Sequence, residues 1–132
     1  MPMYDYKFLL DEAVDQCAAA STYTTAEINF GVTNPNVGAS GKFGAHVVIT
    51  TTYTNLESGV NVWVMHGAAT TPTTKLCART LAVADMVAGA HFYIPIPPTN
   101  LQYMRLKFVP VSETSTNGAC TTWLGPMTGD EI

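Results

Sequence analysis

The stretch His91-Phe-Tyr-Ile-Pro-Ile-Pro-Pro-Thr-Asn-Leu-Gln-Tyr-Met-Arg-Leu-Lys-Phe-Val-Pro-Val111 decides the fold class of this chain. Side chains alternate along a strand, so Phe92, Ile94 and Ile96 share one face of its first part. Residues 97–100 then form a proline corner, which ends strand pairing because proline has no N–H to donate. The stretch therefore predicts two β-strands separated by a corner.

The second strand of this stretch has two chemically different faces. Its apolar face consists of Met104, Leu106 and Phe108. Its polar face consists of Tyr103, Arg105 and Lys107. Such alternation is typical of a strand with one face in a core and the other available to water or a partner. We therefore expect the polar face to contact a neighbouring chain.

The rest of the chain repeats short strand patterns between turn signals. Candidate strands cover residues 27–30, 43–53, 60–66, 75–83 and 118–124. Segments rich in Gly, Asn, Pro and Ser separate them, as turns require. About seven or eight short strands at such spacing predict an all-β fold, a jelly-roll-like antiparallel β-sandwich. An immunoglobulin-like sandwich is the alternative, although its Cys–Trp–Cys signature is absent.

We divide the chain into an N-terminal arm of residues 1–26, a β-sandwich domain of residues 27–126, and a short acidic tail of residues 127–132. Residues 7–20 favour helix formation, so a short amphipathic helix is one interpretation of the arm. Their apolar stripe is weak, however, and we favour a mostly extended arm.

An arm without its own core becomes ordered only by docking on something else. Aromatic side chains are enriched where proteins contact one another. The aromatic residues near the start of the arm are Tyr4, Tyr6 and Phe8. We predict that these three residues, together with the polar face of the second strand, bind a partner.

Charge and composition limit the function classes. Charged residues make up 12% of the chain, about half the share in an average globular protein. A surface with few charges is poorly protected against association, which indicates coverage by other chains; an ordinary secreted β-domain is the alternative. The net charge of −4 argues against a nucleic-acid partner, which requires a basic face.

The three cysteines, Cys17, Cys77 and Cys120, form neither an even set nor a CxxC pair. We expect reduced thiols that act as small core residues, as in a reducing cytoplasm. The first residues do not have the pattern of a signal peptide. No stretch approaches the length of a transmembrane helix, so we expect no membrane partner.

No constellation of residues indicates catalysis. The histidines, His46, His66 and His91, lie on three separate candidate strands without an HxH pair, so we expect no metal site and no partner for His91. The acidic residues lie mostly in turns or in the arm. We expect Trp63 and Trp123 to pack within the sandwich. The sequence therefore predicts a protein that is not an enzyme and needs no cofactor.

The order of several short motifs resembles a known family. The motifs are Leu9-Leu10-Asp11, Ala18-Ala-Ala-Ser-Thr22, Ile28 with Phe30, Ile94-Pro-Ile-Pro-Pro98, Tyr103-Met-Arg-Leu-Lys-Phe108 and Gly118-Ala-Cys-Thr-Thr-Trp-Leu124. This order resembles the small cement, or decoration, proteins on the heads of tailed bacteriophages. The resemblance covers nearly the whole chain.

The resemblance implies a jelly-roll sandwich on the outer surface of the virion's capsid, assembled in the host cytoplasm. It also implies dimers or trimers that bridge neighbouring copies of the phage major capsid protein, without enzymatic activity. The alternative is a jelly-roll module of a phage head fibre or tail that binds a carbohydrate or a receptor. For a sugar site, the candidate residues are Asn55, Asn61 and Trp63.

Overall fold

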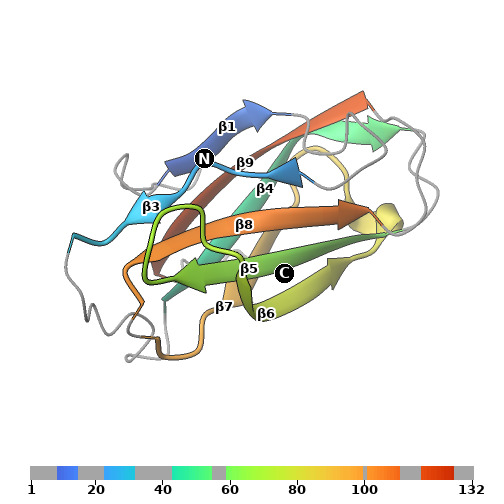
Figure 1. Ribbon diagram of the computed structural model, residues 1–132. Helices are drawn as coiled ribbons and strands as arrows, with labels where there is room; N and C mark the ends of the chain where they lie inside the picture. The colour runs from blue at the N-terminus through green and yellow to red at the C-terminus, as the bar shows by residue number, and fades with distance from the viewer. Residues whose placement is uncertain are drawn as a thin grey trace.

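The computed structural model describes residues 9–14, 23–31, 43–54, 59–99, 101–110 and 117–126. These residues form two antiparallel sheets that face each other, with β8 and β5 crossing in front of β9 and β4 in Figure 1. The first sheet has the order β1 (Leu9–Val14), β9 (Asn117–Pro126), β4 (Phe43–Thr54) and β7 (His91–Pro95). The second has the order β2 (Tyr23–Thr24), β8 (Tyr103–Pro110), β5 (Val60–Gly67) and β6 (Thr74–Leu81), and β3 (Ile28–Asn29) also pairs with β8.

Without the two-residue β3, this order is that of a jelly roll. The pairs β1 and β2, β4 and β5, β6 and β7, and β8 and β9 each place their two members in opposite sheets. The prediction of an all-β, jelly-roll-like antiparallel sandwich is thus confirmed. The described residues contain no helix that is long and apolar enough to cross a membrane.

Two segments of the predicted N-terminal arm belong to the sheets. Leu9–Val14 pairs with β9, with two shifts of register, and the Leu10 side chain is buried in the core. Tyr23–Thr24 pairs with β8. Both segments are extended rather than helical, because each completes the hydrogen bonding of an edge. Residues 1–8 and the predicted tail lie outside the described residues.

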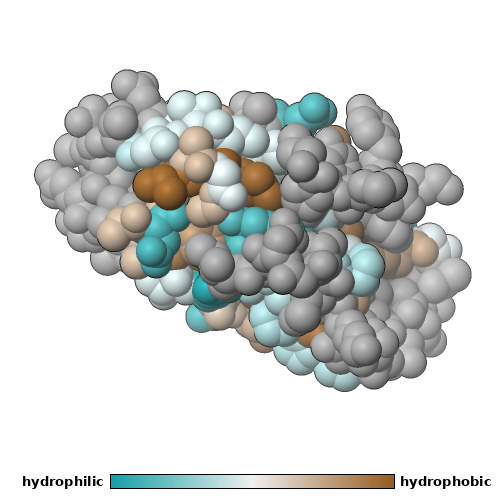
Figure 2. Space-filling view, turned by 180° about the vertical axis from the view of Figure 1, so that it is seen from behind, coloured by the Kyte–Doolittle hydropathy of each residue, from teal (hydrophilic) through white to brown (hydrophobic). Residues whose placement is uncertain are grey.

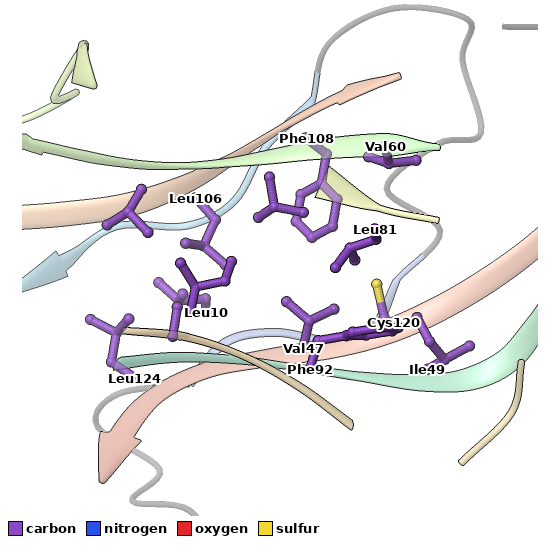
Figure 3. Packing of buried hydrophobic residues seen from close by; sticks show 14 of the residues in the cluster. Leu10, Val47, Ile49, Val60, Leu81, Phe92, Leu106, Phe108, Cys120 and Leu124 are labelled. Carbon is purple, nitrogen blue, oxygen red and sulfur yellow. The ribbon is translucent and has the colours of Figure 1, made fainter. Parts of the chain in front are cut away.

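The core fills the space between the sheets. Figure 3 shows side chains of the two sheets pointing toward one another, including Leu106, Phe108 and Val60 from one layer and Val47 and Leu124 from the other. Burying one such side chain stabilises the fold by roughly 1.5–3 kcal/mol. The apolar faces predicted for the opening stretch are confirmed: Phe92, Ile94, Ile96, Met104, Leu106 and Phe108 all belong to the core.

The predicted proline corner is confirmed at Pro97 and Pro98. β7 ends at Pro95, and one further hydrogen bond, from the Ile96 N–H to the Phe43 carbonyl, extends the pairing with β4. Pro97 and Pro98 are exposed and outside any strand. The corner therefore carries the chain from the first sheet to β8 in the second.

Side chains of β6 cover the edge of β7. The Arg79 Nη1 donates to the Tyr93 carbonyl over 2.8 Å, and the Cys77 thiol lies 3.6 Å from the Pro95 carbonyl. The 3-10 helix η2 (Val83–Asp85) follows β6, and Met86 just after it is fully buried. Figure 2 shows the molecule from behind the view of Figure 1. The coloured surface there mixes small hydrophobic and hydrophilic groups without one broad patch.

Candidate partner-binding site

The outer face of the second sheet carries the predicted polar residues of β8. The register of β8 against β5 places Tyr103 beside Gly67, Arg105 beside Met65, and Lys107 beside Trp63. All three β8 side chains are half-buried, whereas the alternate residues of the strand are in the core. The predicted division of β8 into two faces is confirmed; its use in binding a partner stays a prediction.

Trp63 lies between two lysines on this face. The Lys75 Nζ is 4.6 Å from the centroid of the indole ring, and the Lys107 Nζ is 5.2 Å from it. Both distances suit a cation–π interaction, which holds an ammonium group over an aromatic face. The expectation that Trp63 packs within the sandwich is wrong, because Val62 and Val64 occupy the inward positions of β5.

Lys75 comes from β6, on the other side of β5. Ala78, which has a small side chain, stands directly opposite Trp63. A register shift between Val64 and Met65 then brings Lys75 opposite Met65, next to the indole. Three strands therefore contribute to one small aromatic and cationic surface, which we call the Trp63 face: Trp63, Lys75 and Lys107.

Arg105 positions the connection between β5 and β6. Its Nε donates to the Pro72 carbonyl over 3.0 Å. The neighbouring Thr71, whose φ of 54° lies in the left-handed region, donates its N–H to the Glu27 carboxylate over 2.8 Å. Glu27 and Arg105 thus hold adjacent residues of one loop. This arrangement fixes the loop at the border of the Trp63 face.

Positive side chains dominate the charge of this face. Among the described residues, no ion pair joins Lys75 or Lys107 to a carboxylate. The Glu27 carboxylate accepts a hydrogen bond from the Thr71 N–H, in the loop that Arg105 also contacts. Asp11 and Glu12 belong to β1 in the other sheet. The Trp63 face is therefore a local positive surface on a chain whose net charge is −4.

A second cluster lies on the outward side of the first sheet. The His46 Nδ1 is 2.8 Å from the His91 Nε2, and the His46 ring stacks on Trp123 with centroids 4.9 Å apart. All three side chains are buried. The expectation that His91 lacks a partner is wrong, because β4 and β7 pair with His46 opposite Tyr93 and His91 two positions away.

The hydrogen-bond partners limit the roles of the ring nitrogens of this pair. The His46 Nε2 lies 3.0 Å from the Pro126 carbonyl and must donate to it. When His46 carries that single ring proton, its Nδ1 accepts from the His91 Nε2–H. Among the described residues, no group of three His, Cys, Asp or Glu side chains could hold a metal ion. The pair joins β4, β7 and β9, which is a structural role.

The remaining candidates are dispersed. His66 Nδ1 is 2.8 Å from the Thr99 hydroxyl, and burial lowers the pKa of His66 below its ordinary 6.5. Cys120 is in the core, as expected, and burial raises the pKa of the half-buried Cys77 thiol. Tyr4, Tyr6, Phe8, Cys17 and Asn55 lie outside the described residues.

A protein-family model, Bbp16, matches residues 13–124. The chain belongs to the Bbp16 family. This family is phage-related. No curated protein matches the chain.

The span shared with the Bbp16 family contains the Trp63 face and the buried histidine pair. The span begins after Tyr4, Tyr6 and Phe8. Of the predicted partner-binding residues, only Tyr103, Arg105 and Lys107 therefore lie both within the Bbp16 match and on a described surface.

Proposed function

We propose that this Bbp16-family protein is a capsid cement, or decoration, protein that binds the outer surface of a phage head and stabilises the lattice of the major capsid protein. The observation that carries the proposal is the match of a phage-related family to nearly all of a jelly-roll sandwich. The Trp63 face supports it, because aromatic and cationic side chains on a rigid sheet suit a protein interface better than a reaction.

The proposed mechanism is mechanical. DNA packed in a head pushes outward on the shell. A protein that binds only the expanded lattice stabilises that lattice by mass action, since it favours the state to which it binds. Many symmetric copies add avidity without strong single contacts. No catalytic step or cofactor enters this mechanism, and the protein acts as a dimer or trimer that bridges neighbouring capsid subunits.

A carbohydrate- or receptor-binding module is the second candidate, since Asn61 and Trp63 share one face of β5. Two features argue against a sugar site there. The Asn61 Oδ1 accepts a hydrogen bond from the Thr80 hydroxyl, and two ammonium groups approach the indole of Trp63. A sugar ring that stacked on Trp63 would have to displace them.

The test is to mix the purified protein with expanded, undecorated heads and with unexpanded heads of the same phage. We expect binding at a fixed copy ratio to the expanded heads alone, and a higher temperature of head disruption. Sedimentation with gel densitometry measures the first, and light scattering during heating measures the second. Equal binding to both head forms, or no binding at saturating protein, would overturn the proposal.

The role of the N-terminal aromatic residues is tested by a chain that lacks residues 1–8. This deletion removes Tyr4, Tyr6 and Phe8 but keeps β1 and the buried Leu10. A longer deletion, through residue 15, would also remove β1 and confound binding with stability. We expect lower occupancy of heads with an unchanged circular dichroism spectrum. Unchanged occupancy would show that these residues are not needed for docking.

A further inference from the structure

We infer that the Trp63 face is the surface with which this protein meets the capsid, and that it recognises carboxylate side chains of the capsid protein. This inference deepens the proposed function and rests on it. It assigns the docking role to Lys75 and Lys107 on either side of Trp63, and it assigns an acidic protein surface as the partner.

Charge is the first argument. The chain has six Lys and Arg residues in total, and Arg105 and the two lysines of the Trp63 face lie on adjacent strands of one sheet. Lys75 is exposed and Lys107 is half-buried. Neither has an ion-pair partner among the described residues. Complementary charge across an interface favours correct encounter and excludes wrong partners, so this surface suits an acidic partner.

The second argument is preorganisation. A flexible lysine normally loses rotamer freedom when it binds, which lowers affinity. Here the indole already holds both ammonium groups at 4.6 and 5.2 Å from its centroid. An ammonium group has three N–H donors, so it can bind a carboxylate while it remains over the ring. Trp63 itself is half-buried and resembles the aromatic anchors of interface centres.

The third argument is rigidity. Every residue of the Trp63 face lies on a strand, and Val62 and Val64 anchor the opposite face of β5 in the core. The hydrogen bond from Arg105 to Pro72 holds the adjoining loop in place. A contact surface on strands keeps its geometry better than one on mobile loops. The face can therefore bind a surface of fixed shape.

Other occupants fit less well. In a two-fold contact between two copies, each surface meets itself, so the lysines of both copies would face one another and repel. A nucleic acid requires a broad basic surface, whereas the described part of this face offers two lysines and the chain has a net charge of −4. A small acidic patch of another protein requires only local complementarity, which Lys75 and Lys107 supply.

The test compares the parent with Lys75→Gln, Lys107→Gln and the double variant in binding to expanded heads. Thr50→Glu, at an exposed position of β4 in the other sheet, is the matched control, because it changes the net charge by the same one unit as each single variant. We expect the double variant to bind roughly tenfold more weakly per site. We also expect a smaller loss of its binding between low and physiological salt, and no change for Thr50→Glu.

A second measurement tests the chemistry without heads. Polyglutamate and a DNA duplex are each titrated into the protein at low salt while tryptophan fluorescence is recorded. We expect polyglutamate to alter the emission of the parent and not of the double variant. Tighter binding of the duplex, or an equal response of the two proteins to polyglutamate, would overturn the assignment of an acidic protein partner.

The outcomes with heads separate the two proposals. If the parent binds and the double variant binds equally well with the same salt dependence, the Trp63 face is not the docking surface and the cement function stands. If the parent does not bind at all, the cement function fails and the inference fails with it. Circular dichroism and thermal melting of each variant establish that the fold is retained.

Discussion

At the scale of single residues, His66 has an environment that makes stability depend on pH. It lies near the end of β5 with its Nδ1 2.8 Å from the Thr99 hydroxyl, and burial lowers its pKa below 6.5. As the pH falls, His66 takes up a proton at a higher pH in the unfolded chain than in the folded chain. Stability therefore decreases as the pH decreases. The contribution of His66 is fully present above about pH 6.5 and is lost as the pH falls through the lower folded pKa.

We therefore predict an NMR titration in which the imidazole of His66 has a pKa below 6.5. The reason is the desolvation of the charged ring. Replacing His66 by Gln identifies its signal and removes its part of the pH dependence of urea unfolding. A measured pKa at or above 6.5 would contradict the burial that the fold gives this ring.

At the scale of elements, β8 has an apolar face in the core and a polar face on the outside of the second sheet. Leu106 is fully buried, whereas its neighbour Lys107 reaches the outer face. We predict that Leu106→Ala lowers the free energy of unfolding by about 2–5 kcal/mol, because it leaves a cavity between the sheets. Lys107→Ala, on the opposite face, should change it by less than about 1 kcal/mol. Urea unfolding measures both, and similar losses would mean that the faces of the strand are reversed.

The same strand shows which features the sequence can and cannot predict. Alternation is a property of neighbouring residues, so the sequence predicts the faces of β8 and the end of strand pairing before Pro97. Pairing joins segments that are distant in the chain, and alternation does not say which strands are neighbours. For that reason alternation predicts neither the contact of Lys75 with Trp63 nor that of His46 with His91, although it places each of these residues on a strand.

The N-terminal segment illustrates a related limit. Leu9–Val14 reads LLDEAV, which does not alternate apolar and polar residues, and its pairing with β9 contains two shifts of register. The position of Leu9–Val14 depends on its pairing with β9. The place of β9 in the sheet follows only from the complete fold. The sequence therefore indicates an extended arm, whereas this segment is an edge strand of the first sheet.

At the scale of the whole molecule, the two edges of the first sheet, β1 and β7, are poorly suited to joining another sheet. Side chains of Cys77 and Arg79 reach the outward carbonyls of β7, and β1 is irregular and carries Asp11 and Glu12. Bulges, charges and covered edges all oppose the addition of a further strand. Assembly through a sheet face, as proposed for Trp63, is consistent with these protected edges.

The jelly-roll topology also makes the C-terminal strand essential to the fold. β9 is the last strand in the chain, yet it lies between β1 and β4 in the centre of its sheet. It contributes Cys120 and Leu124 to the core, and Trp123 to the cluster around His46. Without β9, the first sheet would be split into β1 alone and the pair β4–β7, and one side of the core would be open to water.

We therefore predict that a chain ending at residue 116 does not fold, whereas a chain ending at residue 126, after the last residue of β9, unfolds cooperatively like the parent. The physical reason is that non-local pairing with β9 must form before the apolar faces of the two sheets can be covered. Near-ultraviolet circular dichroism and urea titration distinguish the two chains. Cooperative unfolding of the shorter chain would mean that β1, β4 and β7 form a stable layer without their central strand, contrary to the topology.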